Sequence, residues 1–436
     1  MTATDTHRTI DAVWRMESAK LIAGLTRIVQ DVGLAEDLAQ DALLAALERW
    51  PETGVPDRPG AWLMATAKHR AIDQLRRGKM LDRKHVEVGH ELEQRQETAA
   101  AKIDEAIDDD IGDDLLRLMF MTCHPVLSTE ARVALTLRLL GGLTTAEIAR
   151  AFLTSEPTVA QRIVRAKRTL AEARVAFEVP RGPALAARLS SVLGVIYLVF
   201  NEGYSATAGD DWMRPQLCEE ALRLGRILAG LAPAEPEVHG LMALMEIQAS
   251  RLRARLGPAG EPVLLLDQDR GRWDQLLIRR GLAALERANA LTGSPGPYAI
   301  QAAIAACHAR ARTPDETDWA RIASLYQDLV RLTPSPVVEL NRAVAVGMAY
   351  GPAAGLEIAD RLRSEPALEV YHLLPAVRGD LLTKLGRQNE ARLEFERAAS
   401  LTRNVQEREL LLARAAGCRP AESALADSGQ DSSARP

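Results

Sequence analysis

The sequence LTTAEIA lies at residues 143–149, and PTVAQRIVRAKR follows at residues 157–168. Thr144 or Thr145 suits the N-cap of a first helix, because a side-chain oxygen there accepts a backbone N–H of the first turn. Pro157 suits the first turn of a second helix, where its missing N–H is not needed. Two helices joined by so short a break form a helix-turn-helix, which the spacing therefore predicts.

A second patterned stretch, GLAEDLAQDALLAALERW, occupies residues 33–50. Its apolar residues recur at helical spacing, and we expect a helix with an acidic first turn. Trp50-Pro51 interrupts the pattern, so a loop is predicted from Pro51 to Gly60. A further helix is predicted from Pro59 through residues 61–77, which begin AWL and end DQLRR.

The composition indicates an all-α protein of two or three domains. The chain has 436 residues, with 47% hydrophobic and 4% aromatic residues, too long for one ordinary core. The longest apolar run, Ser191–Phe200, is too short to span a membrane, so we expect a buried helix there. The four cysteines are scattered without metal-ligand spacing, which favours reduced thiols in the cytoplasm and no metal.

The charge is unevenly distributed along the chain, although its net value is only −5. Lys68–Lys84 carries seven basic and two acidic residues, and Arg150–Arg174 carries six and two. An acidic stretch ending in Asp104–Asp110 separates them. Two basic islands are typical of a protein that contacts DNA at two places, although two solvated helix faces would give the same pattern.

The C-terminal half shows loose helical repeats. Small and aromatic residues recur at intervals close to the tetratricopeptide period of about 34 residues, where they allow paired helices to pack closely. Two helical runs are predicted to begin at Ser294-Pro295 and Ser335-Pro336, and two turns at Gly351 and Gly386. The repeated small or aromatic positions include Ala302, Ala343, Ala391, Phe395 and Ala398.

Residues 33–77 resemble region 2, and residues 143–168 resemble region 4, of bacterial sigma factors of the extracytoplasmic-function (ECF) group. The two occur in the right order with a short linker. The resemblance covers about Val13–Phe177, and the helical extension resembles a subset of the group with a tetratricopeptide-like C-terminal domain. It implies two small helical sigma domains followed by α-helical repeats. The expected divisions are 10–80 (region 2), 81–114 (acidic linker), 115–180 (region 4), 181–290 (helical extension), 291–416 (repeats) and 417–436 (disordered tail).

The resemblance implies a role for each motif. The helix of region 2 docks on the clamp helices of the largest subunit of RNA polymerase, and region 4 contacts the flap. The loop and helix that follow read the −10 element, and the second helix of region 4 reads the −35 element in the major groove. The polymerase contacts carried over are Asp37, Gln40 and Asp41, with an acidic helix start as the plain alternative. The −10 contacts are Lys68, His69, Arg70, Arg76 and Arg77.

In region 4, Thr158, Gln161, Arg162 and Arg165 are predicted to read bases, since arginine to guanine is a common specific contact. Contacts to phosphates, which position without specifying, are assigned to Thr144, Thr145, Lys167 and Arg168. The core is predicted to include Ile148, Ala149, Val159, Ile163 and Val164. The chain departs from the family pattern in three places: His69 replaces asparagine, Leu153 replaces a turn glycine, and Pro157 replaces a small residue.

The extension has one dense polar stretch, LLLDQDRGRWD at residues 264–274. It suggests either a regulatory interface, formed by Asp267, Asp269, Arg270, Arg272 and Trp273, or an inter-helix loop anchored by Trp273. Residues 201–204 with 209–212 are a weaker candidate of the same kind.

A sigma factor, with a C-terminal domain required for activity and able to bind a protein partner, is the leading hypothesis. It requires no catalytic residue, cofactor, metal or membrane anchor, because the polymerase performs the chemistry. A helix-turn-helix regulator with a partner-sensing repeat domain is the alternative, but it leaves residues 33–77 unexplained. A repeat scaffold would leave both basic islands without a role, and an enzyme is the least favoured class.

Overall fold

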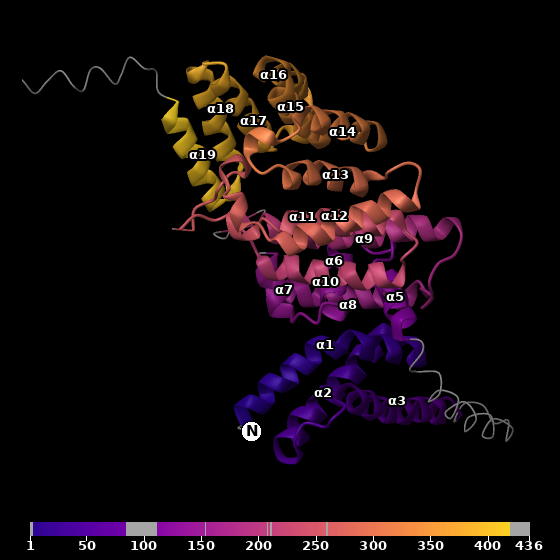
Figure 1. Cartoon of the computed structure of the whole chain (residues 1–436). Helices are drawn as coiled ribbons and strands as arrows, with labels where there is room; N and C mark the ends of the chain where they lie inside the picture. The colour runs from indigo at the N-terminus through magenta and orange to yellow at the C-terminus, as the bar shows by residue number, and fades with distance from the viewer. Residues whose placement is uncertain are drawn as a thin grey trace, which may run out of the picture. The chain divides into compact units, whose positions relative to one another are not determined.

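The computed structural model describes residues 3–83, 111–152, 154–206, 208–209, 212–258 and 260–418. They form two compact units, residues 1–199 and 200–436. The predicted all-α class is confirmed, because the only strands among these residues are two of two residues each (Figure 1).

The N-terminal unit begins with three helices, α1 (Ala3–Val29), α2 (Val32–Thr53) and α3 (Pro59–Arg83), each in contact with the other two. Their core contains Leu25, Leu38, Trp50 and Leu63, which are each at most 2% exposed. The ring of Trp62, which is half-buried, meets the Trp50 ring edge-on with 5.3 Å between the ring centroids, so it packs against this core.

The boundaries of α2 correct two predictions. The helix starts at Val32, where the Asp31 side chain accepts the Leu34 N–H at 2.8 Å. Glu36 and Asp37 therefore lie beyond the first turn, which contains no acidic residue. Pro51 does not end the helix, which continues to Thr53 and ends at Gly54. The backbone of Gly54 has φ +85, a conformation that glycine adopts without steric cost.

Helices extend into both ends of the predicted linker, residues 81–114. Helix α3 runs on to Arg83, so residues 78–83 are helical. The next helix begins at Ile111 rather than at Leu115. The acidic residues 104–110 lie outside the described residues.

Four helices form the second part of this unit: α5 (Ile111–Thr122), α6 (Thr129–Leu139), α7 (Thr145–Ala151) and α8 (Glu156–Glu172). The helix-turn-helix is α7 and α8, as predicted. Thr144 is the N-cap of α7: its hydroxyl accepts the Glu147 N–H, and the Glu147 carboxylate accepts the Thr144 N–H. This reciprocal capping box explains why α7 begins where it does. Ser155 caps α8, and Pro157 lies in the first turn. Leu153 lies outside the described residues.

Helix α9 (Pro183–Tyr204) contains the apolar run that we expected to be a buried helix. The helix is longer than that run, and over Ala184–Tyr204 it is long and apolar enough to cross a membrane by length and composition alone. Its first half is bonded to α5 within the N-terminal unit. The Ser191 hydroxyl donates to the Cys123 carbonyl at 2.7 Å, and the Arg188 guanidinium donates to the Phe120 carbonyl at 3.0 Å.

The C-terminal unit is a series of helices in which most pack on their neighbours in the sequence, while α11 packs on both α12 and α13 (Figure 1). Its α-helices after α9 are α10 (Pro215–Leu231), α11 (Pro236–Ala249), α12 (Gln275–Leu291), α13 (Pro297–Arg310), α14 (Trp319–Leu332), α15 (Pro336–Tyr350), α16 (Pro352–Arg361), α17 (Leu373–Lys384), α18 (Gln388–Leu401) and α19 (Val405–Gly417). Its 3₁₀ turns are η2 (Leu252–Ala254), η3 (Leu265–Asp267), η4 (Arg270–Arg272), η5 (Pro314–Glu316), η6 (Leu362–Ser364) and η7 (Pro366–Leu368). Strands β1 (Ala208–Gly209) and β2 (Arg403–Asn404) pair in parallel, with Ala208 opposite Arg403.

The predicted small and aromatic positions are buried between paired helices. Ala302, Ala343, Ala391 and Ala398 are completely buried, and Phe395 is 1% exposed. A Cβ atom at Gly379 would lie 2.7 Å from the Phe395 ring, so glycine permits the close approach of α17 to α18.

Two turns and two helix starts can be compared with the prediction. Helix α15 begins at Pro336, as predicted. Gly351 and Gly386 lie in turns with positive φ, as expected. The run predicted from Pro295 begins two residues later, at Pro297. Of the segment expected to be a disordered tail, Gly417 ends α19 and Cys418 is buried, while residues 419–436 lie outside the described part.

Candidate functional site

The recognition helix candidate, α8, has one buried and one open face. Val159, Ile163, Ala166 and Leu170 are buried, at the i, i+4, i+7 and i+11 spacing of a helix stripe. The predicted core position Val164 is wrong: it is 64% exposed, because one residue beyond Ile163 turns a side chain about 100° away from the stripe. The other predicted core residues, Ile148, Ala149, Val159 and Ile163, are buried.

The open face of α8 carries three of the predicted base readers. Thr158, Gln161 and Arg165 are exposed, and Arg162 is half-buried beside them. The Thr158 hydroxyl lies 2.7 Å from that of Ser155, the N-cap. An exposed arginine and glutamine near the start of such a helix have the donors that hydrogen-bond guanine and adenine edges.

The four predicted phosphate contacts differ in their surroundings. The Thr144 hydroxyl is engaged in the α7 cap. Thr145 is half-buried in the first turn of that helix. Arg168 is exposed and pairs with Glu172 at 2.6 Å, a surface pair that water and salt weaken. Lys167 is mostly buried and pairs with Glu36 of α2.

The predicted polymerase contacts on α2 lie next to this pair. Asp37 and Asp41 are exposed, four residues apart on one face of the helix. The Gln40 amide donates to the Glu36 carboxylate at 2.8 Å. Asp41 is 3.2 Å from Arg70 of α3, so one predicted polymerase contact is paired with one predicted −10 contact.

Helix α3 presents part of the predicted −10 surface. His69 and Arg70 are exposed, and Lys68 is half-buried. The side chains of Arg76 and Arg77 are not among those the structure describes.

The prediction missed a buried charge cluster at the centre of this unit. Glu36 is 3% exposed, and Arg138 of α6 donates to its carboxylate at 2.7 Å, while Lys167 of α8 forms the second ion pair. Burial alone would raise the pKa of Glu36, but the two cations outweigh it and lower that pKa. The cluster therefore joins α2 to α6 and to α8 of the helix-turn-helix.

The polar stretch of the C-terminal unit is largely structural. Arg270 donates to the carbonyls of His308 and Ala311, both at 2.7 Å, and to the Thr317 hydroxyl at 3.1 Å. Trp273 is 3% exposed. For Arg270 and Trp273, these contacts agree with the second predicted alternative, an inter-helix loop anchored by Trp273.

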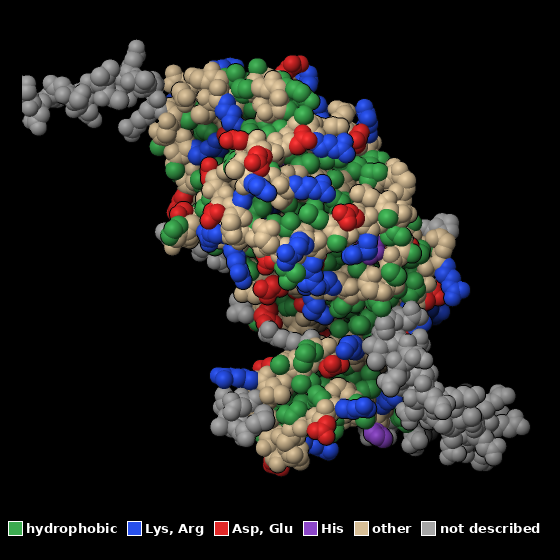
Figure 2. All heavy atoms as spheres, viewed as in Figure 1, with side chains coloured by type: hydrophobic (Ala, Val, Ile, Leu, Met, Phe, Trp, Pro, Cys, Tyr) green, Lys and Arg blue, Asp and Glu red, His purple; other side chains and the backbone are tan. Residues whose placement is uncertain are grey.

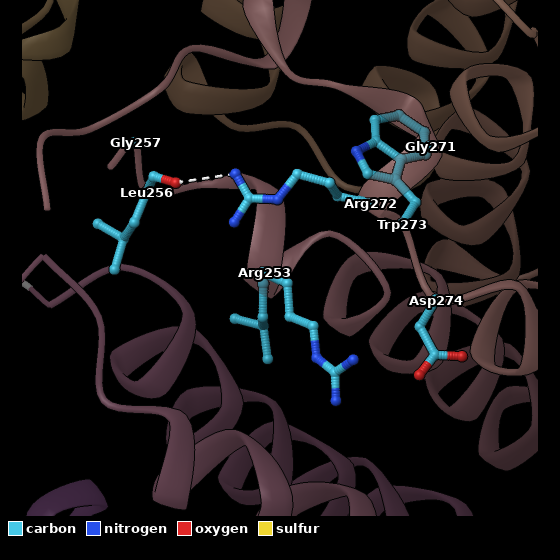
Figure 3. A pocket seen from close by; sticks show the side chains of 8 residues that line it. Arg253, Leu256, Gly257, Gly271, Arg272, Trp273 and Asp274 are labelled. Carbon is cyan, nitrogen blue, oxygen red and sulfur yellow. Dashed lines mark hydrogen bonds between the residues drawn. The ribbon is translucent and has the colours of Figure 1, made fainter. Parts of the chain in front are cut away.

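The other charged residues predicted for the interface in this stretch are exposed to solvent. Asp269 is exposed and accepts the Gly271 N–H at 2.9 Å. Asp267 and Arg272 are exposed, and Arg272 borders a pocket with Trp273 (Figure 3). The arginines of residues 251–255, which sequence reasoning missed, lie beside this stretch. Their only signal in the sequence was a short basic run.

Comparison with known proteins gives three family matches along the chain. Residues 14–80 match sigma-70 region 2, residues 117–170 match sigma-70 region 4, and residues 188–289 match a family of unknown function, DUF6596. The third match begins inside α9 and ends in α12. No solved structure matches the chain.

Curated relatives agree with the two sigma matches. An uncharacterized protein of Rhizobium meliloti is 45% identical over 88% of this chain and 90% of its own length. The probable ECF RNA polymerase sigma factor SigI of Mycobacterium tuberculosis is 27% identical over 40% of this chain and 58% of its own length. The ECF RNA polymerase sigma factor SigC of the same species is 29% identical over 33% and 71%. The chain thus belongs to one family with the Rhizobium protein. Its matches to sigma-70 regions 2 and 4, together with the ECF relatives, support a sigma-70, ECF-like sigma factor.

Proposed function

We propose that this protein binds core RNA polymerase through the Asp37, Gln40 and Asp41 face of α2 and directs initiation at promoters with specific −10 and −35 elements. Helix α3 and the loop before it read the −10 element, and α8 reads the −35 element. The observation that carries the proposal is the exposed face of α8. It supports a sigma factor because the same chain also matches region 2. Such a function places the protein in the cytoplasm, with the polymerase and the promoter.

Reading both elements requires a change within the N-terminal unit. The names of the elements imply a separation of about 25 base pairs, which is about 85 Å of duplex at 3.4 Å per base pair. In the structure α2 and α8 are joined through Glu36 and Lys167. We infer that engagement of the promoter separates these helices and breaks the Glu36 cluster.

We also propose that the C-terminal unit, with its tetratricopeptide-like helix pairs, controls activity and is required for it. The support comes from α9, whose residues belong to both units. Its first half is bonded to α5 through Arg188 and Ser191. A helix held in this way offers a route by which the C-terminal unit, or a protein partner bound to it, can influence region 4.

The test is run-off transcription with purified chain and core polymerase on a promoter library. Core-dependent, sequence-selective initiation is the expected result. Tight, sequence-specific binding to DNA by the chain alone, without initiation, would instead favour the helix-turn-helix regulator with a partner-sensing repeat domain.

The need for the C-terminal unit is tested by truncation in the same assay. A cut near Arg181 would remove Arg188 and Ser191 and so disturb region 4 itself. A cut after Tyr204 keeps these contacts, and loss of initiation by that variant, with core binding retained, is the expected result. If the truncated variant initiated more than the full chain does, the C-terminal unit would inhibit initiation instead of being required for it.

A further inference from the structure

Three arginines and three aromatic rings alternate in one cluster of the C-terminal unit. The guanidinium carbon (Cζ) of Arg255 lies 3.9 Å from the centroid of the Tyr204 ring and 5.4 Å from that of a Trp212 ring. The distances below join the same kinds of points. Arg251 lies 5.8 Å from Tyr204 and 5.9 Å from Trp273, and Arg270 lies 5.0 Å from Trp273. We call Tyr204, Trp212, Arg251, Arg255, Arg270 and Trp273 the arginine–aromatic cluster.

The cluster concentrates positive charge that the described residues leave without a carboxylate partner. Arg251 is 7% exposed, and its side chain forms no hydrogen bond or ion pair within the described part of the chain. Arg255 donates to the Met213 sulfur at 3.2 Å, and the three acceptors of Arg270 are uncharged. A buried charge without a counter-charge is destabilising and rare in folded proteins.

Buried hydrogen-bonding atoms without partners gather in the same place. Six of the twelve such side-chain atoms in the described residues belong to this cluster or its neighbours. They are Nε of Arg251 and Arg270, Nε1 of Trp212 and Trp273, Nδ1 of His308 and Oε1 of Gln268. The arginine and tryptophan atoms can only donate. Buried donors in folded proteins usually have an acceptor, and these four have none within the described residues.

The neighbouring His308 side chain is also affected by this positive charge. Burial, and then the fields of Arg251 and Arg270, lower the pKa of His308 to about 4. Burial and the nearby Arg251 also lower the pKa of Arg270, against a weaker opposing effect of Glu316. Burial is the larger cause of both shifts, and the neighbouring positive charges add to it.

A pocket opens to the surface at Trp273. Its volume is about 570 Å³, and it is formed by Leu252–Gly257 on one side and Gly271–Asp274 on the other (Figure 3). Arg253 and Arg272 are its charged donors, and Arg272 is held in place by a 3.3 Å bond to the Leu256 carbonyl. The Asp274 carboxylate lies at the rim, where its Oδ1 accepts the N–H groups of Leu276 and Leu277 at the start of α12.

We propose that this pocket binds a small oxyanion, a molecule bearing a phosphate or carboxylate group, through Arg253, Arg272 and the Trp273 indole N–H. Arg251 and Arg270, both stacked on Trp273, supply further positive charge. Arginine suits this ligand because its planar fork donates two parallel hydrogen bonds to such groups.

The size of the pocket favours a small molecule over a macromolecule. Its volume lies within the roughly 300 to 1,000 Å³ typical of small-ligand sites. Acidic and basic side chains are interspersed over the C-terminal unit on the face shown in Figure 2, so that face offers no continuous basic track for a polyanion. The proposed binding does not depend on the function proposed above, and it is measured without polymerase or DNA.

The test is titration calorimetry of the full chain with two probes, inorganic pyrophosphate and citrate, at constant ionic strength with sodium chloride as the reference. Saturable 1:1 binding of at least one probe is expected, and the preferred probe distinguishes a phosphate from a carboxylate ligand. Arg253→Ala with Arg272→Ala should weaken binding at least tenfold, because each lost charged hydrogen bond is worth about a factor of ten or more. Arg279→Ala, an exposed arginine on α12, is the matched control and should bind as the unchanged protein does.

A buried substitution separates ligand binding from structural support. Arg251→Met removes the orphaned charge while keeping an apolar side chain against Trp273, so it should weaken binding without lowering the unfolding temperature of the ligand-free protein. The proposal is overturned if neither probe binds saturably, or if the double variant binds like the Arg279→Ala control. It is also overturned if Arg251→Met lowers the unfolding temperature and leaves binding unchanged, because Arg251 would then be a structural residue only.

Discussion

The Glu36 carboxylate of α2 accepts a hydrogen bond from Arg138 of α6 at 2.7 Å, across 102 residues of sequence. Lys167 of α8 pairs with the same carboxylate. One buried side chain thus connects α2, the helix proposed to bind polymerase, with α6 and with α8, the helix proposed to read the −35 element. Since the cations lower the pKa of Glu36, its charge stabilises this packing above its unfolded pKa of about 4.5 and is lost as the pH falls through the lower folded value.

We predict that Glu36→Gln destabilises the N-terminal unit by about 1 to 3 kcal/mol. Removing one member of a buried ion pair costs about 3 to 5 kcal/mol, but Arg138 and Lys167 keep about a fifth of their side chains exposed and can be partly hydrated. Urea unfolding at pH 7 measures the change. Glu48→Gln, an exposed glutamate on the same helix, is the control and should shift the midpoint little. Equal shifts for both variants would show that the cluster adds no stability.

A second prediction concerns base reading by α8. Arg165→Ala should reduce initiation at the preferred promoter about 5- to 150-fold, because a base contact is worth about 1 to 3 kcal/mol. Its binding to core polymerase should be unchanged. Promoter variants at each −35 position, assayed by run-off transcription, would show relaxed selectivity at one position. Loss of output that is uniform across all promoters would mean that Arg165 contacts phosphate rather than a base.

The polymerase face of α2 should behave in the opposite way. Asp37→Ala combined with Asp41→Ala should weaken core binding in a pull-down, since both carboxylates are exposed on one face. Because Asp41 also pairs with Arg70, the single variant Arg70→Ala separates loss of that pair from loss of the carboxylates. If the aspartate variant and Arg165→Ala gave the same defect in the pull-down, the division of roles between α2 and α8 would be wrong.

Local signals were sufficient for the elements of the helix-turn-helix. Thr144, Ser155 and Pro157 act within a few residues of themselves, so their sequence positions define where α7 and α8 begin. Val164 was misplaced because two adjacent apolar residues both suit a helix, and only packing determines which of them points inward. Pro51 was misread because a proline in the last turn of a helix does not have to end it.

Long-range partners could not be read from the sequence. In the sequence Glu36 is one of several acidic residues of a helix, and its burial depends on Arg138 and Lys167, which only the fold brings to it. Arg251 and Arg255 lie in a short basic run, RLRARLG at residues 251–257, that resembles a solvated surface. Their stacking on Tyr204 and Trp273 requires the tertiary structure.

His308 gives a prediction in which the sign of the pH effect is fixed. Its pKa falls from 6.5 to about 4 on folding, so the unfolded chain takes up a proton more readily than the folded one. Stability contributed by the neutral imidazole is complete above pH 6.5 and is lost as the pH falls toward 4, by about 2 to 3 kcal/mol at pH 4.5. The variant His308→Gln has no imidazole to protonate, so it should not lose this stability as the pH falls. Hydrogen-exchange protection of the α13 amides, compared between the two proteins at pH 7 and pH 4.5, should therefore fall more in the unchanged protein. An equal fall in both would show that His308 is as readily protonated in the folded chain as in the unfolded one.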